Sequence, residues 1–281
     1  MHALGVATVE DAERLVQASP LSHIKVGLSD VDGVMLGKYL RRDKFLGALR
    51  SGLAFCDVVF GWDLDDQLYD NTKYTGWHTA YPDAKLRIVP QTGRRLPLEQ
   101  GPGGEDMLLF LAEFEGDAGA ICPRRLLHRT LDRAAGMGYD VYAALEYEFF
   151  MFRETPHSVR AKHYRNMENW TPGNFGYSML RSTVEGDFYR KLLDMCERMD
   201  MPIEGLHTET GPGVLEAAIA VDQAAAAGDK AFLFKTFTKA LAQQNGLMAT
   251  FMAKWSHDHP GQSGHIHLSL REKLSLIHIS E

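Results

Sequence analysis

The chain has 281 residues, enough for one large domain or two smaller ones with a substantial buried core. Hydrophobic residues make up 45% and charged residues 24%, an ordinary composition for a soluble globular protein. The formal net charge of −7 and the lack of any lysine or arginine stripe argue against a general nucleic-acid binder.

The cysteines and the N-terminal residues bear on the compartment. Cys56, Cys122 and Cys196 are odd in number, far apart, and without metal-ligand spacing, which favours a reducing compartment. The first residues lack the basic segment and apolar run of a signal peptide, and no apolar stretch approaches membrane-spanning length. We therefore expect a cytoplasmic protein with no membrane partner.

The first 40 residues predict a helix followed by β structure. Thr8 and Asp11 form a capping-box pattern ahead of a run of helix formers, so a helix is expected over 8–18. Short strands are expected over 23–40, on either side of a turn at 30–33 where Asp and Gly cluster.

The character of the sequence changes between Glu99 and Pro123, where we place the domain boundary. Residues 51–104 are rich in Gly, Asp, Pro and aromatic residues and show no helical period. A strand is expected over 107–114, and Pro123 predicts the start of a helix that ends near Gly136.

After that boundary the patterns of strands and helices alternate, which predicts an α/β or α+β domain with a mixed sheet. We expect strands over 139–152, 202–207, 214–220, 247–253 and 265–270, a helix over 182–200 with a Ser182–Glu185 capping box, and a helix over 221–245 closed by Gly246. The segment 153–181 is long for a connector, and this length is typical of a functional loop.

Two glutamates lie in one of these expected strands. Glu146 and Glu148 are two residues apart, so both side chains project from the same face of the strand. Adjacent like charges repel unless a cation lies between them. The strand ends in the apolar run 149–152, which indicates burial on both faces and favours a metal site over a solvated acidic face.

A second pair of acids flanks a turn signal. Glu209 and Glu216 lie on either side of Gly211-Pro-Gly213, which can bring two strands side by side. The acids then either face one site or project singly into solvent from the two arms of a hairpin, and the sequence leaves both interpretations open.

Histidines supply a third element of the pattern. His265 and His267 share a strand face and follow Gly264, where the backbone can approach a ligand closely. They are either buried, satisfied histidines or ligands, and His207 is open to the same two interpretations. Because hard divalent cations select oxygen ligands, the converging acids predict a metal site, and with it an enzyme.

Three ordered segments together resemble the glutamine synthetase family. Leu145-Glu-Tyr-Glu-Phe-Phe-Met-Phe is similar to the family's Glu-x-Glu-Phe-Phe strand, and His207-Thr-Glu-Thr-Gly-Pro-Gly-Val-Leu-Glu to its His-His-Glu-x-x-Pro-Gly-Gln-x-Glu segment. The third segment has two parts. The first part, Ala249-Thr-Phe-Met-Ala-Lys, is similar to the family's Ala-Thr-Phe-Met-Pro-Lys. The second, Ser263-Gly-His-Ile-His-Leu-Ser-Leu, is similar to its Gly-Ser-Gly-x-His-x-His-x-Ser-Leu. Residues 22–104 resemble its small β-grasp domain more weakly.

The resemblance implies an α+β fold in three parts. These are an N-terminal β-grasp domain with a leading helix over 1–104, an incomplete catalytic β-barrel/α domain over 105–270, and an atypical tail over 271–281. The tail does not resemble the family's sequence, which continues well beyond this point, so the chain is interpreted as C-terminally truncated.

The resemblance also implies a chemistry. The family uses ATP to phosphorylate the γ-carboxylate of glutamate, and ammonia or another amine then displaces the phosphate. Two Mg²⁺ or Mn²⁺ ions assist, and the active site forms between subunits of a homo-oligomeric ring. Carried over by motif, Glu148, Glu209 and Glu216 would hold the first ion. Glu146 and His265 would hold the second ion, beside the ATP phosphates. His267 would contact nucleotide or phosphate, and Gly264 would contact the glutamate backbone.

Within the matched segments the sequence departs from the family pattern in three places. Thr208 replaces the second histidine of His-His-Glu, and one residue is missing before His-x-His. The family's Asp-Gly-Ser-Ser stretch, whose acid helps bind ammonium, has no clear copy; residues 60–66 occupy that region. The acceptor is therefore either ammonia or a larger amine.

The leading hypothesis is an ATP-dependent ligase that forms a γ-glutamyl amide. One rival is a non-catalytic or inactive truncated homologue that keeps the fold. Another is a carboxylate metallohydrolase, which would hydrolyse its substrate without ATP.

Overall fold

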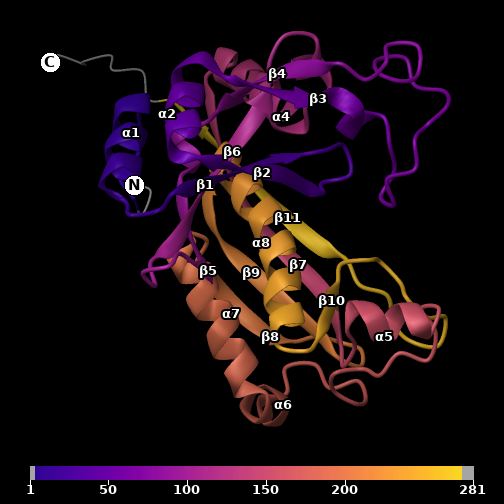
Figure 1. The fold of residues 1–281 in the computed structure, drawn as a ribbon. Helices are drawn as coiled ribbons and strands as arrows, with labels where there is room; N and C mark the ends of the chain where they lie inside the picture. Colours follow the sequence, from indigo (N-terminus) through magenta and orange to yellow (C-terminus); the bar gives the residue numbers. More distant parts are fainter. Residues whose placement is uncertain (1–3, 274–281) are drawn as a thin grey trace, which may run out of the picture.

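Two β-sheets that share one hydrophobic core organise residues 4–273, the part of the chain that the computed structural model describes (Figure 1). The first sheet has the order β2-β1-β6-β4-β3, with β5 also paired to β6. β1 runs parallel to β6, and the other pairs are antiparallel. Its strands are β1 (His23–Ser29), β2 (Met35–Arg41), β3 (Leu53–Cys56), β4 (Asp83–Ile88), β5 (Arg94–Gln100) and β6 (Asp106–Phe114).

The local signals of the first 40 residues are confirmed. Helix α1 (Val9–Ala18) begins with the predicted capping box: Thr8 Oγ1 accepts from the Asp11 N–H at 3.1 Å, and the Asp11 carboxylate accepts from the Thr8 N–H at 2.9 Å. The turn between β1 and β2 is closed by Asp30, whose Oδ1 accepts from the backbone N–H groups of Asp32 and Val34.

Strand β6 ties the first sheet to the rest of the chain. It is buried at every position after Asp106 and pairs with β1, β4 and β5. The predicted division at 104/105 places this strand on the catalytic side, whereas its hydrogen-bonding partners all belong to the first sheet. The division of the chain into domains therefore stays a prediction, and the pairing favours a boundary after Phe114.

The second sheet is antiparallel throughout and is built around the long strand β7 (Tyr139–Phe152). One edge of β7 pairs with β9 (Val214–Gln223), which pairs in turn with β8 (Ile203–Thr208). The other edge is shared: β11 (Gly264–Glu272) pairs with residues 139–147, and β10 (Met248–Thr250) with residues 150–152.

Helices pack on and between these sheets (Figure 1). The longer ones are α2 (Arg42–Ser51), α4 (Pro123–Gly136), α7 (Gly186–Arg198) and α8 (Ala224–Gln244). The short ones are α3 (Ala118–Ile121), α5 (Pro156–Ala161) and α6 (Met179–Val184), with 3₁₀ turns η1 (Asp57–Phe60) and η2 (Pro90–Thr92). No helix among residues 4–273 is both long enough and apolar enough to cross a membrane.

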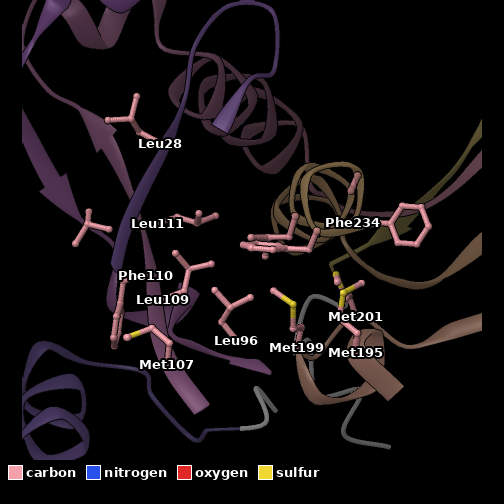
Figure 2. Packing of buried hydrophobic residues seen from close by; sticks show 14 of the residues in the cluster. Leu28, Leu96, Met107, Leu109, Phe110, Leu111, Met195, Met199, Met201 and Phe234 are labelled. Atoms are coloured by element: carbon pink, nitrogen blue, oxygen red, sulfur yellow. The ribbon is translucent and has the colours of Figure 1, made fainter. Parts of the chain in front are cut away.

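The core joins the two sheets. Figure 2 shows Leu28 and Leu111 of the first sheet in the same cluster as Phe234 of α8. Phe234 is fully buried and lies against Tyr147 and Phe149 of β7, with ring centroids 5.8 and 6.0 Å apart. Residues 149–152 are all fully buried, which confirms the predicted burial of this strand end on both faces.

Several expected element bounds were wrong. The predicted helix 182–200 is two helices, because Glu185 leaves the helical conformation (φ −94°, ψ 19°) between α6 and α7. Ser182 lies inside α6, and the N-cap is Ser178, whose Oγ accepts from the Arg181 N–H. The predicted Ser182–Glu185 capping box therefore does not form.

Two further bounds shift, and part of one prediction is untested. The expected strand 247–253 ends at Thr250, since the Gln262 side chain binds the carbonyls of Thr250 and Met252 and turns the chain away. The helix expected over 221–245 starts at Ala224, because residues 221–223 extend β9. The expected atypical tail falls mostly on 274–281, outside the described residues.

Candidate functional site

Strand β7 carries the first two predicted ligands at the centre of the second sheet. Glu148 lies opposite Glu216 of β9, and Glu146 lies opposite His265 of β11. The strand's alternation therefore places its two acids between the strands that carry the other predicted ligands.

The β8–β9 hairpin brings in the second pair of acids. Gly211 (φ +135°) and Gly213 (φ +71°) make the turn, and a Cβ at Gly213 would lie 2.5 Å from the Met151 carbonyl oxygen. The Glu209 N–H donates to the Val214 carbonyl at 3.0 Å and closes the hairpin. Of the two interpretations left open by the sequence, the structure supports the one in which Glu209 and Glu216 face one site.

His207, Glu209 and Glu216 form one cluster of potential donors, here called the hairpin group. The Nε2 atom of His207 lies 3.4 Å from Glu209 Oε2 and 3.3 Å from Glu216 Oε2. The three side chains are only 14 to 28% exposed. Nε2 itself is buried and, among the described residues, has no hydrogen-bond partner.

Glu146, Glu216 and His265 form a second cluster, here called the β11 group, which shares Glu216 with the hairpin group. His265 Nδ1 lies 2.9 Å from Glu146 Oε2, and His267 Nε2 lies 3.3 Å from the other oxygen of that carboxylate. Both histidines are about 60% exposed, since β11 is exposed along its whole length. Of the two interpretations left open by the sequence, the one in which His265 and His267 are buried, satisfied side chains is therefore not supported.

The electrostatics distinguish the acid shared by the two groups from its neighbours. Burial raises the pKa of Glu216, and the charges of Glu148, Glu146 and Glu209 raise it further, against the opposing effect of His207. Burial also acts to raise the pKa of Glu146, but His267 and His265 outweigh it and hold that pKa below its ordinary value. Among the three acids of the two donor groups, Glu216 is thus the one whose charged form is disfavoured, and a bound cation would stabilise that charged form.

Glu209 is stabilised as a carboxylate by its own turn. Burial acts to raise its pKa, but the Thr210 backbone N–H, which donates to Glu209 Oε1 at 2.7 Å, and the neighbouring His207 lower it more. This acid is therefore kept charged and aimed into the hairpin group.

Two of the predicted residues have other visible roles. Glu148 is in neither donor group, and its Oε2 accepts from the Ser263 N–H at 2.9 Å. A Cβ at Gly264 would lie 2.3 Å from the Glu146 carbonyl oxygen, so the close pairing of β11 with β7 accounts for the glycine. The predicted metal role of Glu148 and the predicted substrate role of Gly264 stay predictions.

The donor chemistry fits a divalent cation. Carboxylate oxygens and imidazole nitrogens are ligands of Mn²⁺, and carboxylates are ligands of Mg²⁺. No lysine or arginine within residues 4–273 lies within ion-pairing distance of the four glutamates. A buried nitrogen without a partner, beside two carboxylates, is what a cation would complete.

The sequence missed the surroundings of His207. Tyr177, in the segment 153–181 expected to be functional, stacks on the His207 ring with centroids 4.4 Å apart and an interplanar angle of 11°. Stacking between residues 30 apart leaves no local sequence pattern, so only the unusual length of the segment indicated it.

Comparisons with known proteins give the same picture. The sequence model of the family "Glutamine synthetase, catalytic domain" matches residues 120–277. Type-1 glutamine synthetase 2 of Dictyostelium discoideum is 42% identical over 255 residues, which are 90% of this chain and 48% of that protein. Glutamate–isopropylamine ligase of a Pseudomonas species is 31% identical over 258 residues, which are 92% of this chain and 56% of the ligase.

A solved structure supports the fold. The glutamine synthetase of Plasmodium falciparum superposes with a TM-score of 0.75 over 97% of this chain and 55% of that one, at 16% identity. At this identity the likeness shows a mixed α/β fold of the same kind and nothing further. The chain spans about half the length of the curated relatives it matches.

Proposed function

Because this chain belongs to the glutamine synthetase family, we propose that the protein is an ATP-dependent carbon–nitrogen ligase that forms a γ-glutamyl amide from glutamate and ammonia or a small amine. The observation that carries the proposal is the convergence of four glutamates and three histidines from β7, β8, β9, β11 and the β8–β9 turn, with no lysine or arginine of residues 4–273 pairing the acids.

The proposed reaction has two steps. An oxygen of the glutamate γ-carboxylate attacks the γ-phosphorus of ATP, and the bond to the ADP oxygen breaks. The amine nitrogen then attacks the acyl carbon, phosphate leaves with the attacking carboxylate oxygen, and the nitrogen loses a proton. Divalent cations would neutralise the charge that accumulates on the phosphoryl oxygens.

The residues of the two donor groups would hold those cations. We assign Glu209 and Glu216, with Glu148 beside them, to the cation at the amide-forming centre, and Glu146 with His265 to the cation beside the ATP phosphates. His267, which lies 3.3 Å from Glu146, would contact nucleotide or the transferring phosphate, and Gly264 would lie along the bound glutamate backbone. These assignments rest on the family motifs together with the observed proximities.

An isotope experiment tests the reaction directly. Glutamate labelled with ¹⁸O in its γ-carboxylate should transfer one labelled oxygen to the released phosphate, in a reaction that needs ATP, an amine and Mg²⁺ or Mn²⁺. Labelled phosphate from the wild-type protein and none from Glu216→Gln would support the proposal. Glutamate-independent ADP release, or phosphate without label, would contradict it.

The acceptor amine is the finer part of the proposal. Isopropylamine is named as the substrate of one relative, and the family's Asp-Gly-Ser-Ser stretch has no clear copy in this chain, where residues 60–66 occupy that region. The same assay with ammonia, isopropylamine and ethanolamine at equal concentration ranks the acceptors. A homologue without turnover, the alternative hypothesis, would release no ADP with any of them.

We further propose that the protein works in the cytoplasm as a homo-oligomeric ring, as the family resemblance implies. Three free cysteines among the described residues fit a reducing compartment. Light scattering of the purified protein tests the assembly, and a monomeric mass at all concentrations would contradict it.

A further inference from the structure

A cavity of about 330 Å³ lies between the two sheets, where residues of β1, β6, α4, β7 and α8 line it. Leu145 and Tyr147 supply its β7 side. Because side chains alternate along a strand, these two point to the face opposite Glu146 and Glu148. The ring of Tyr147 stacks on Phe234 of α8, which covers that opposite face. The cavity is therefore separate from both donor groups.

Most of the cavity wall is apolar. Leu28 and Leu111, both labelled in Figure 2, line it from the first sheet, and Leu127 of α4 and Phe232 of α8 line it from the helices. Small-molecule sites in proteins typically measure about 300–1,000 Å³ and have mainly apolar walls with a few polar groups. At about 30 Å³ for each water-sized group, this cavity holds about ten non-hydrogen atoms. It therefore suits a small ligand with an apolar body.

Three charged side chains line the cavity, and one of them has no partner. Arg124 donates from Nε and Nη2 to the two carboxylate oxygens of Asp229, at 2.9 and 3.0 Å, so these two are paired. Lys235 of α8 makes no ion pair or hydrogen bond with any described residue. Its Nζ atom lies beside the β1–β2 turn, 3.8 Å from the position that a Cβ at Gly33 would take. The wall thus presents one unpaired ammonium group.

The acid closest to this ammonium group is used by the β1–β2 turn. Asp30 Oδ1 accepts from the backbone N–H groups of Asp32 and Val34, at 2.9 and 2.8 Å. Burial raises the pKa of Asp30, although the charge of Lys235 acts to lower it. Lys239, one turn further along α8, has its pKa lowered by burial and by the charge of Lys235. No described acid therefore pairs with Lys235, and a second lysine adds to the local positive charge.

A hydroxyl group of the cavity wall is also without a partner. The Tyr147 hydroxyl makes no hydrogen bond with any described residue. Burial raises the pKa of Tyr147, so this hydroxyl stays protonated at neutral pH and can donate. An ammonium and a hydroxyl donor beside an apolar wall match a negatively charged head group that only accepts hydrogen bonds. A carboxylate is a small organic group of that kind.

We propose that this cavity binds a monocarboxylate with an apolar body of about eight carbons, whose carboxylate pairs with Lys235 and accepts from the Tyr147 hydroxyl. The apolar body lies against the leucines and the phenylalanine of the wall. This site goes beyond the proposed ligase reaction, because it uses none of the residues assigned to the cations, the nucleotide or glutamate.

Calorimetry with octanoate tests the ligand class. The protein should bind one octanoate per chain with a dissociation constant below about 1 mM. Octanol keeps the chain and removes the charge, and octylammonium keeps the chain and reverses the charge. Both should bind at least about tenfold more weakly than octanoate, because the ion pair with Lys235 is lost or becomes a repulsion.

Substitutions of the two lysines of α8 test the head-group contact. Lys235→Met keeps an apolar stem, removes the charge, and should weaken octanoate binding at least about tenfold, to the affinity of octanol. Lys235→Arg keeps the charge and should keep the preference for octanoate over octanol. Lys239→Met is the matched control, since Lys239 is partly buried on the same helix but does not line the cavity. It should bind octanoate nearly as the wild type does.

Two further variants test the hydroxyl and the apolar body. Tyr147→Phe removes only the hydroxyl and should weaken octanoate binding a few-fold. Ala231→Leu places a larger side chain in the wall and should weaken octanoate and octanol alike, because both chains lose the same space. Urea unfolding shows whether each variant is folded. If Ala231→Leu does not fold, the lysine variants and the three ligands still decide the question.

Two results would overturn the inference. One is a folded wild-type protein that binds no octanoate. The other is octanoate binding of equal strength in the wild type and Lys235→Met, which would place the ligand elsewhere. Glu216→Gln should bind octanoate as the wild type does, because the cavity lies on the other face of β7. Octanoate binding by a protein that forms no amide would leave this inference standing while the proposed function fails.

Discussion

Two clusters of acids in this molecule are neutralised in different ways. Glu113 of β6 is completely buried and is surrounded by the guanidinium groups of Arg87, Arg124 and Arg125. The site glutamates are also partly or largely buried, but among residues 4–273 the only basic side chains within ion-pairing distance of them are histidines. The fold thus pairs an acid with arginines where the charge is structural, and leaves acids without them where a cation can bind.

The pKa values follow this difference. Burial acts to raise the pKa of Glu113, but Arg124 and Arg87 outweigh it and hold the pKa below its ordinary value. Burial raises the pKa of Glu216, and three neighbouring carboxylates add to the effect. Arginines neutralise Glu113, whereas Glu216 has no lysine or arginine partner among the described residues, and the proposed cation would neutralise it.

The largest effect is expected from breaking the arginine cluster. Glu113→Gln leaves buried guanidinium groups without their acid and should lower the free energy of unfolding by about 3–5 kcal/mol. Urea unfolding measures this loss of free energy of unfolding. The control is Glu168→Gln, which removes an acid 4.0 Å from Arg153 at an exposed position away from this cluster, and should cost less than about 1 kcal/mol. Equal losses would mean that burial of Glu113 is not what makes it important.

The next largest effect is expected at the acid shared by both donor groups. Glu216→Gln removes one ligand from each group and should weaken Mn²⁺ binding by at least about 100-fold, measured by calorimetry. Glu204→Gln, an exposed acid on strand β8, is the matched control and should bind as wild type does. Undiminished binding by Glu216→Gln would contradict the assignment of the site.

The pH dependence of stability should have opposite signs in the two clusters. Since the folded pKa of Glu113 is depressed, its stabilisation is present above the unfolded pKa, near about 4.3, and is lost as the pH falls through the folded value. Glu216 has a raised folded pKa, so without metal its contribution is present at low pH and lost as the pH rises through that value.

Unfolding measured in a chelating buffer at a series of pH values tests both signs. Glu113→Gln should reduce the loss of stability on acidification, and Glu216→Gln should reduce the loss as the pH rises above the ordinary glutamate range. Parallel profiles for the two variants would show that the clusters do not differ in the way described.

The smallest effect is the stability of Glu216→Gln at neutral pH without metal. Removing a charge repelled by three carboxylates should leave the free energy of unfolding unchanged or raise it by less than about 1 kcal/mol. Mn²⁺ at about 100 times its dissociation constant should stabilise the wild type by about 2.7 kcal/mol and this variant far less. A large loss of metal-free stability in Glu216→Gln would indicate a structural role for this acid.

What the sequence could predict depended on how local the signal was. Strand β7 was predicted at its observed bounds, because its alternation and apolar end are continuous in the chain. The β8–β9 hairpin followed from two glycines around a proline. In contrast, β3, β4 and β5 were not assigned within 51–104, where short strands alternate with turns and the region shows no period.

The site divides in the same way. The motifs indicated Glu146, Glu148, Glu209 and Glu216, but they could not fix which atoms meet. The contact of His265 with Glu146 joins residues 119 apart, and that of Tyr177 with His207 depends on hydrogen bonds to a buried threonine. Strand register and side-chain stacking are tertiary properties, so they appear only once the sheet is assembled.

The most direct test of the account is the position of bound Mn²⁺, from the anomalous scattering of crystals soaked in Mn²⁺. The account predicts one strong peak beside Glu209 and Glu216, with Glu148 next to it, and a second beside Glu146 and His265. Peaks only at other carboxylates, with the four site glutamates free of metal, would contradict it.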